Sequence, residues 1–488
     1  MRNANESVFK PALLLAGGRA TALAVTFLLP VVFARIFAPS EFGTYKQIFL
    51  IHATVYALGL GLADALFYFL PAEPERAGRY VANSVAMLTG LGVTGFVILT
   101  ALRDHLARWL NNSMLSNLAP LIGLYLALTL VSATLEIVMI ARGRNGLAAA
   151  AYAVSDLIRV LFVLIPVAVW PRLDVLVAGS IGFAMVRVAG TVIFFRREFT
   201  LGLWPDGDCL RKQLRYTIPL QAAIALQVLQ SNLHQYVISL RFDAAQFAQY
   251  AVGCTNIPVF DLIAGSVLSV MMIQMGEGLS QSRVERVLQI WADATRKLAI
   301  VFFPILVLLW MESRDFITLL FTDRYIPSVP VFRVCLLSYF FVTFQPHGVL
   351  RVYADTRFLA MQNLVKVVIV VALIGPMIST FGLSGAVLSS VLALLGGKCM
   401  LVLRMKRLMQ VELSRVLPWR TLAGIASLSL IAAAPAAALG YFVQSGAAVR
   451  LVSVGGVYAM AYGVSVWLFE LRSGQKPLLK NAASSWQT

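Results

Sequence analysis

Long runs of apolar residues, each separated from the next by a short polar segment, dominate the pattern of this sequence. A helix needs about 20 apolar residues to cross the hydrocarbon core of a bilayer. The runs are long and continuous, whereas a transmembrane barrel would show short alternating segments. The pattern therefore predicts an all-α polytopic membrane protein with about 14 transmembrane helices. The expected spans are roughly 12–36, 46–71, 80–102, 116–141, 148–170, 174–195, 214–240, 250–275, 297–320, 328–353, 358–380, 383–403, 417–442 and 447–470.

One polar segment has a helical pattern of its own. Between residues 277 and 297, Glu, Ser, Gln and Arg side chains are interspersed with Val284, Val287, Leu288 and Ile290. Apolar residues at this spacing predict an amphipathic helix that lies on the inner membrane surface.

Two of the polar bends repeat each other. Residues 239–250 follow residues 34–45 at an interval of 205 positions, and an apolar run flanks each bend on both sides. Three aromatic residues of the first bend recur at this interval in the second: Phe37, Phe42 and Tyr45 correspond to Phe242, Phe247 and Tyr250. A repeat of this length indicates a duplicated bundle rather than a solenoid.

The number of spans between the two bends fixes the symmetry of the repeat. Six spans separate the start of helix 1 from the start of helix 7, so both copies begin on the same side of the membrane. We therefore expect a parallel repeat about an axis along the membrane normal. The predicted division is an N-terminal lobe at 1–200 with helices 1–6, a C-terminal lobe at 201–410 with helices 7–12, and a segment at 411–488 with helices 13–14 and a cytoplasmic tail.

Composition agrees with a membrane protein, and the distribution of Lys and Arg over the connections explains the basic net charge. The 488 residues are 59% hydrophobic and 13% charged, against about 25% charged in soluble domains. The net charge of +17 does not indicate nucleic-acid binding, because 25 Lys and Arg fall in connections on the side of the N-terminus and nine on the other. Basic residues are enriched in cytoplasmic loops, so we expect both termini in the cytoplasm.

Enzyme and redox motifs are missing from the sequence. It contains no GxxxxGK[ST], HExxH or GxSxG motif, and no outer connection is long enough for a catalytic domain. We therefore expect no enzymatic activity, no cofactor and no metal site. The four cysteines are far apart and form no CxxC motif, so we expect them to act as small apolar fillers. The first apolar run is too long for a signal-peptide core and is expected to remain as helix 1.

The seventh span is unusually polar on one face. Gln227, Ser231 and His234 follow a helical spacing, and Gln230 flanks them. Because each unsatisfied polar group in hydrocarbon costs several kcal/mol, this face must meet water or other helices. Two interpretations stay open: the stripe lines a cavity, or it supplies interhelical hydrogen bonds worth about 0.6 kcal/mol each.

Several spans carry charge. Arg19 in helix 1 requires a compensating anion or water, and it either contacts substrate or pairs with Asp64 at similar depth in helix 2. Asp156 and Arg159 lie three residues apart on one helix face and are able to pair, with Glu136 as a third member.

The second half also carries charge within its spans. Lys366 follows Arg159 by 207 positions, which places a cation at nearly the same point of each copy. His52 and Asp261 stand near the middle of their spans. Each is either a hydrogen-bonded structural residue or a carrier of a coupling ion, and Asp64 is the third ion-coupling candidate.

The first bend also carries a family resemblance. The sequence Arg-Ile-Phe-Ala-Pro-Ser-Glu-Phe-Gly-Thr-Tyr at 35–45 resembles the first-helix junction of bacterial polysaccharide flippases. These are the Wzx-like members of the multidrug/oligosaccharidyl-lipid/polysaccharide (MOP) exporter superfamily. Gly-Leu-Gly-Leu at 59–62, Phe-Leu-Pro at 69–71 and Arg-Gly-Arg at 142–144 are similar to that family as well, whereas Ala248 replaces Gly43 in the second bend.

The resemblance implies two six-helix lobes around a cationic cavity, and a flippase in the bacterial inner membrane that works by ion-coupled alternating access. The implied substrate is a polyprenyl-pyrophosphate-linked oligosaccharide repeat unit for surface or exopolysaccharide assembly, with H+ or Na+ as the coupling ion. We expect a monomer, either alone or associated with polysaccharide assembly proteins. The expected substrate-binding residues are Arg19, Gln227, Gln230, Ser231, His234, Arg159 and Lys366.

Other functions remain open. A multidrug or cation antiporter of the same superfamily shares the duplicated fold, although cations inside the spans favour an anionic lipid. A membrane glycan polymerase or ligase would typically carry a large outer loop, which this sequence lacks. A purely structural scaffold would leave the polar stripe of the seventh span without a use.

The charge asymmetry makes the topology testable. In a cysteine-free background, Pro205→Cys should resist a membrane-impermeant thiol reagent added outside intact cells and react after the membrane is opened. A cysteine at Arg108, in an outer connection, serves as the accessible control. Labelling of position 205 from outside would reverse the orientation.

Overall fold

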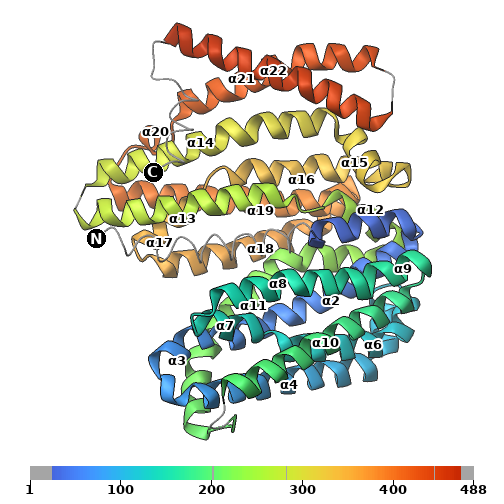
Figure 1. Cartoon of the computed structure of the whole chain (residues 1–488). Helices are drawn as coiled ribbons and strands as arrows, with labels where there is room; N and C mark the ends of the chain where they lie inside the picture. Colours follow the sequence, from blue (N-terminus) through green and yellow to red (C-terminus); the bar gives the residue numbers. More distant parts are fainter. Residues whose placement is uncertain (1–24, 200–202, 282, 444–445, 474–488) are drawn as a thin grey trace. The chain divides into compact units, whose positions relative to one another are not determined.

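The computed structural model describes residues 25–199, 203–281, 283–443 and 446–473 (Figure 1). Every regular element in these ranges is helical, which confirms the predicted all-α class. The chain forms two compact units, Met1–Ala251 and Val252–Thr488. Arg19 lies outside the described residues.

The first unit contains the apolar runs up to the second bend. Its longest helix, α11, begins after Asp206, whose side chain accepts a hydrogen bond from the backbone N–H of Cys209 in the first turn. The helices of this unit are Val25–Ile36, α2 Pro39–Asp64, α3 Leu66–Ala72, η1 Pro74–Arg76, α4 Ala77–Ala101, α5 Arg103–Trp109, α6 Met114–Ser132, α7 Leu135–Ala141, α8 Asn145–Arg159, η2 Val160–Leu164, α9 Ile165–Val169, α10 Leu173–Glu198 and α11 Gly207–Arg241.

The second unit contains the remaining runs, and α12 crosses from the first unit into it. Several of its helices begin with Pro in the first turn, where the missing N–H needs no partner. The helices are α12 Ala244–Gly253, α13 Pro258–Ser280, α14 Val284–Met311, α15 Ser313–Phe321, η3 Asp323–Ser328, α16 Val329–Val342, α17 Pro346–Val352, α18 Thr356–Phe381, α19 Leu383–Met409, α20 Leu413–Val416, α21 Trp419–Phe442 and α22 Ala447–Ser473.

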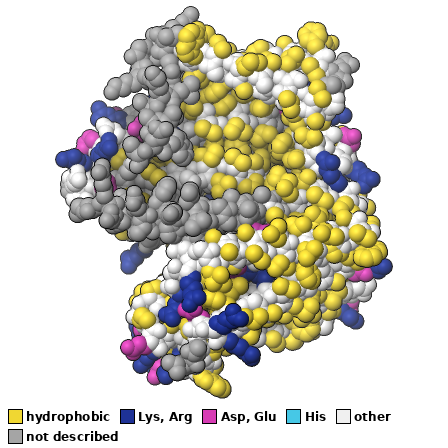
Figure 2. All heavy atoms as spheres, in the orientation of Figure 1, with side chains coloured by type: hydrophobic (Ala, Val, Ile, Leu, Met, Phe, Trp, Pro, Cys, Tyr) yellow, Lys and Arg dark blue, Asp and Glu magenta, His cyan; other side chains and the backbone are white. Residues whose placement is uncertain are grey.

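Eleven helical segments of the described chain are long and apolar enough to cross a membrane. One of them, Thr356–Met409, contains two helices, α18 and α19. Two further predicted spans do not qualify, because α11 is too polar and only Val25–Ile36 of the first run is described. The multi-pass class is therefore confirmed, and the count of fourteen stays a prediction. Figure 2 shows broad hydrophobic areas on the surface, with charged side chains in small separate groups.

The repeated bend is present as two equivalent helix breaks. One helix ends at Ile36 and α2 begins at Pro39, and 205 positions later α11 ends at Arg241 and α12 begins at Ala244. The two breaks also contact each other. A Cβ atom on Gly43 would lie 1.7 Å from the backbone oxygen of Ala244, so only glycine permits this approach.

One turn further along α2, buried amides connect the two copies of the repeat. Gln47 of α2 donates to the Oγ of Ser239 in α11 at 2.7 Å and to the carbonyl of Leu110 at 3.0 Å. Asn112 donates to the Oε1 of Gln47 at 2.6 Å and to Thr44 at 2.7 Å. Because buried amides without partners are costly, these bonds fix the register of α11 on α2.

The connection from α10 to α11 is tied to α4. Asp206 accepts from Arg79 at 2.7 Å, and its backbone exchanges two hydrogen bonds with the side chain of Asn83, at 2.9 and 3.0 Å. The N–H of Cys209, followed by Arg79, lowers the pKa of Asp206 below its usual value. The carboxylate therefore stays charged at neutral pH, and the start of α11 stays with α2 and α4, against which the helix packs.

Contacts place α11 in the first unit, whereas the sequence division begins the second lobe at residue 201. A compact unit is defined by packing and a lobe by the repeat, so the division at 200 and 410 stays a prediction.

The fifth span contains an irregular turn. Between α8 and α9, η2 is a π-helix in which the N–H of Ile165 donates to the carbonyl of Val160, five residues earlier. α10 packs closely on this turn, because a Cβ on Gly179 would lie 2.0 Å from the carbonyl oxygen of Phe162. The π-turn immediately follows Arg159, which forms an ion pair with Asp156 of the same span.

The amphipathic segment at 277–297 is not a separate surface helix. Its larger part begins α14, which continues without a break into the next span to Met311. Val287 and Trp291 are fully buried, and the indole N–H of Trp291 donates to the carbonyl of Val416 at 2.6 Å. The prediction of a surface helix was wrong because the apolar stripe packs on the α19–α21 connection instead of on lipid.

Ion pairs attach the start of α22 to the junction of α14 and α15. Arg450 of α22 contacts Glu312 at 3.1 Å and Asp315 at 3.3 Å. Burial raises the pKa of Glu312, and Arg450 opposes this change. The hairpin of α21 and α22 is thus attached to α14 and α15 near both ends.

The contact of Gly43 with Ala244 yields a stability prediction. Gly43→Ala should lower the unfolding temperature of the purified protein, since the added methyl must separate two backbones, and overpacking typically costs about 1–3 kcal/mol. Gly90→Ala in α4 is the control, because a Cβ there meets nothing within 4 Å; it should be neutral or slightly stabilising. Equal unfolding temperatures for the two variants would contradict the close approach.

Candidate functional site

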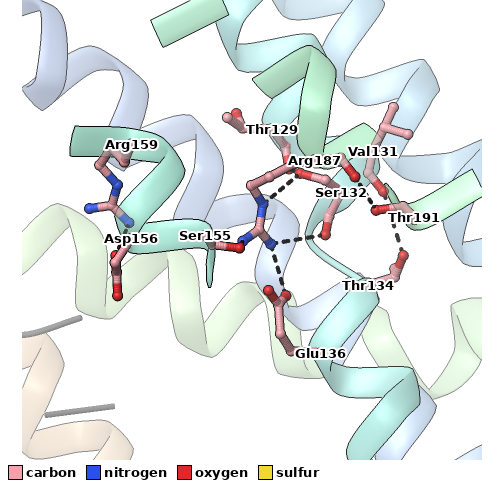
Figure 3. Close-up of polar contacts among 10 residues, drawn as sticks. All are labelled: Thr129, Val131, Ser132, Thr134, Glu136, Ser155, Asp156, Arg159, Arg187 and Thr191. Atoms are coloured by element: carbon pink, nitrogen blue, oxygen red, sulfur yellow. Dashed lines mark hydrogen bonds and ion pairs between the residues drawn. The ribbon is translucent and has the colours of Figure 1, made fainter. Parts of the chain in front are cut away.

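A buried cation and anion stand at the centre of the first unit. The guanidinium of Arg187 in α10 contacts Glu136 of α7 at 2.8 Å and donates to the Oγ of Ser155 in α8 at 2.8 Å (Figure 3). It also donates to the Oγ of Ser132 at 3.4 Å. Glu136 is 4% exposed. This cluster joins four helices, and its cation is neutralised in place.

A second pair lies one turn further along α8. Arg159 contacts Asp156 at 3.0 Å and donates to Thr26 at 3.4 Å, and its guanidinium lies 5.5 Å from the ring centre of Phe183. Figure 3 shows Arg159 and Asp156 pointing to each other, away from Arg187. The predicted pairing of Arg159 with Asp156 is present, but Glu136 joins Arg187 instead.

His52 lies in an aromatic stack of the same unit. Its Nε2 is 2.9 Å from the Oγ1 of Thr129, and its ring stacks on Tyr125 and Tyr56 at centroid distances of 4.5 and 5.6 Å. The half-buried imidazole thus has a hydrogen-bond partner in α6 and aromatic contacts on α2 and α6.

The polar stripe on α11 divides between exposed and half-buried positions. Gln227 and Ser231 are exposed, while Gln230 and His234 are half-buried. His234 Nδ1 lies 2.5 Å from the hydroxyl of Tyr250.

The same helix carries a second polar face, which the sequence analysis missed. Asn232 and Tyr236 bond to Thr54 of α2 at 3.1 and 2.8 Å. Their spacing of four residues was the available signal. This second face therefore forms the hydrogen bonds between α11 and α2, and Gln227 and Ser231 are not needed for them.

The second unit contains a pocket of about 280 Å³. Asp261 of α13, Gln345 and Lys398 of α19 supply its polar groups, and Asp261 is exposed and accepts from Asn256 at 3.2 Å. The Nζ of Lys398 donates to the carbonyl of Phe344, where α16 ends before α17.

Lys366 lies beside Lys398 on the neighbouring helix. A Cβ on Gly397 would lie 2.8 Å from the Cδ of Lys366 and 2.3 Å from the Nε2 of Gln362, so glycine there lets both side chains lie against α19. In the described part of the chain, neither lysine has a carboxylate within ion-pair distance. Two cations of this unit are thus left without a neutralising carboxylate.

The remaining candidates are less constrained. Asp64 is exposed at the end of α2 and forms no ion pair with a described residue, while its expected partner Arg19 lies outside the described residues. No group of three or more His, Cys, Asp or Glu suited to a metal occurs among the residues described.

Comparison with known proteins agrees with the fold. Residues 32–330 match the profile of the protein family described as "Polysaccharide biosynthesis protein". No curated protein matches.

Several solved structures are similar to most of the chain. The lipid II flippase MurJ in an inward closed conformation superposes with a TM-score of 0.74 at 11% identity, covering 94% of this chain and 99% of that one. An inward-facing multidrug resistance transporter of the MATE family within the MOP superfamily gives 0.59 at 15% identity, covering 79% and 94%. A MOP superfamily transporter from Pyrococcus furiosus, described by a binding pocket of reversed polarity, gives 0.54 at 13% identity, covering 82% and 94%. The chain therefore has the fold of MOP superfamily transporters and is a multi-pass membrane protein.

The buried cluster around Arg187 yields a prediction. Arg187→Ala should sharply lower membrane abundance and unfolding temperature, because breaking a buried ion pair by removing one partner costs about 3–5 kcal/mol. The double variant Arg187→Gln/Glu136→Gln should recover part of the loss, since no charge is then stranded. Arg172→Ala, which breaks an exposed pair with Asp174, should have an effect below about 1 kcal/mol. A neutral Arg187→Ala would show that the cluster does not hold the four helices.

Proposed function

The chain belongs to the family of polysaccharide biosynthesis proteins, and from this premise we propose that it is a flippase for lipid-linked oligosaccharide. It moves a polyprenyl-pyrophosphate-linked oligosaccharide repeat unit from the cytoplasmic to the outer leaflet of the bacterial inner membrane. Movement proceeds by alternating access, and both termini are cytoplasmic, in line with the positive charge of the loops on that side.

The observation that carries the proposal is the unneutralised charge of Lys366 and Lys398. In the first unit, Arg159 and Arg187 each have a carboxylate partner at 3.0 and 2.8 Å. The two lysines have none among the described residues, and desolvated cations require an anion, a dipole or water. Lys398 donates one hydrogen bond to a backbone carbonyl, which leaves two of its three N–H donors for a ligand.

A pyrophosphate group fits this charge. It is strongly anionic and does not cross hydrocarbon unaided. At about 4 Å and an effective dielectric constant of about 20, each charge pair contributes about 4 kcal/mol. Two lysines therefore offset a large part of the desolvation of one pyrophosphate. Arg19 is a further cation in this proposal, and Arg159 joins only after releasing Asp156.

The polar stripe of α11 suits the sugar. Gln227 and Ser231 are exposed, and Gln230 and His234 lie beside them. Amide and hydroxyl groups both donate and accept hydrogen bonds, as sugar hydroxyls require. Asn232 and Tyr236 already bind α2, so Gln227 and Ser231 are available to a ligand, whereas His234 is bonded to Tyr250.

Coupling requires a group that binds H+ or Na+. Asp261 is the first candidate, since it lines the same pocket as Lys398. Asp64 is the second candidate, since it is exposed at the end of α2. His52 is the third, and its imidazole is hydrogen-bonded to Thr129.

The competing function is antiport of an organic cation. Asp261 favours it, because an exposed carboxylate in a pocket attracts a cation. Lys398 in the same pocket opposes it by repulsion.

Reconstitution separates the two functions. Proteoliposomes should move a polyprenyl-pyrophosphate oligosaccharide to the opposite leaflet, where a membrane-impermeant glycosidase cleaves the sugar, and they should not accumulate a fluorescent organic cation. Cation uptake without glycan exposure would establish the antiporter instead.

The lysines should carry the transport of the anion. Lys366→Gln/Lys398→Gln should lower the rate of glycan exposure at least about tenfold, which corresponds to about 1.4 kcal/mol, while protein level stays normal. Lys406→Gln at the exposed end of α19 is the matched control and should be silent. Full activity of the double variant would remove these lysines from the site without deciding the transport function.

A further inference from the structure

Two of the four cysteines meet in the second unit. The Sγ atoms of Cys254 and Cys335 are 3.2 Å apart, although 81 positions separate them in the sequence. Cys254 directly follows α12, and Cys335 lies in α16. Both thiols are half-buried and reduced, whereas Cys209 is buried and Cys399 exposed.

The backbone brings this pair together. A Cβ on Gly253 would lie 2.6 Å from the Cβ of Val331, so the end of α12 rests closely on α16. Val331, Cys335 and Tyr339 then follow at intervals of four and form one face of α16. Along this face, Val331 contacts Gly253 and Cys335 contacts Cys254.

Tyr339 completes the contact at the interruption between α12 and α13. Its hydroxyl accepts from the N–H of Ile257 at 2.8 Å and donates to the Oδ1 of Asn256 at 2.8 Å. Residues 254–257 lie between α12 and α13, so the Tyr339 hydroxyl satisfies the N–H of Ile257, which the break has freed. The two thiols are therefore held in register by contacts on both sides of them.

We propose that Cys254 and Cys335 form a reversible intramolecular disulfide that clamps the helix interruption at 254–257 to α16. A disulfide has an S–S length of about 2.05 Å, so the sulfurs need to approach by about 1 Å. Side-chain rotation accommodates such a change between two already adjacent thiols. An S–S bond forms while both S–H bonds break, and two protons and two electrons pass to the oxidant.

The oxidant is a protein or small-molecule disulfide, which is reduced to two thiols in the exchange. In the proposed orientation both cysteines follow outer connections, at residues 242–243 and 322–328. The compartment on that side of a bacterial inner membrane maintains disulfides. The clamp itself does not depend on what the protein transports.

Thiol counting on the purified full-length protein tests the site. Diamide, whose N=N bond takes up the two protons and two electrons, should reduce the number of alkylatable thiols in the denatured protein from four to two. Mass spectrometry should then find one peptide pair, joined through Cys254 and Cys335, which dithiothreitol separates. Cys254→Ser should keep all three remaining thiols, and Cys209→Ser/Cys399→Ser should lose both of its own.

Hydrogen exchange tests the clamp. Oxidation should slow amide exchange at residues 254–257 in the wild type and in Cys209→Ser/Cys399→Ser, and should leave it unchanged in Cys254→Ser. Four thiols after diamide, a link that involves Cys209 or Cys399, or a disulfide between two molecules would overturn the proposed site. A correct link with unchanged exchange at 254–257 would overturn the clamp.

Discussion

The first unit depends on the contact of Gly43 with the backbone of Ala244, where the two copies of the repeated bend meet. No side chain fits between them, so α2 and the start of α12 approach as closely as backbones allow. Gln47, Asn112 and Ser239 then form buried hydrogen bonds directly beside this point. The asymmetry of the bends is visible here: Gly43 meets a backbone, whereas the corresponding residue of the second bend is Ala248.

The two units treat internal charge differently. In the first, Arg187 and Arg159 are matched with Glu136 and Asp156, which makes their charges part of the architecture. In the second, Arg450 is paired with Glu312, but Lys366 and Lys398 have no carboxylate partner among the described residues, and Lys398 donates to a backbone carbonyl. Under the proposed function, the paired arginines hold helices together and the unpaired lysines attract the anion.

Most helices were predictable from the sequence because apolar length is a local property. The predicted bend repeat was also correct to the residue, since both breaks fall 205 positions apart. The segment at 277–297 was misplaced because an apolar stripe does not state whether lipid or protein covers it. Here Trp291 bonds to Val416, 125 residues away.

The candidate site was less predictable, because partners depend on tertiary packing. Asp156 and Arg159 were paired correctly from their spacing on one helix. Glu136 was assigned to them wrongly, since helix α10 brings Arg187 closer. The position of Lys398 was not predicted, because nothing local indicates that it shares a pocket with Asp261. The residues of the α11 stripe remain predicted ligands.

The π-turn η2 has an evolutionary consequence. A π-turn accommodates one residue more than the α-helical turn it replaces, so Val160–Leu164 is the expected trace of a single-codon insertion in an ancestral α-helix. Such an insertion rotates everything after it by about 100° relative to Asp156 and Arg159. Close packing of Gly179 on the carbonyl of Phe162 now makes the extra residue difficult to lose. Homologous chains should therefore divide into those with and without this residue, and small residues at the position of Gly179 should accompany its presence.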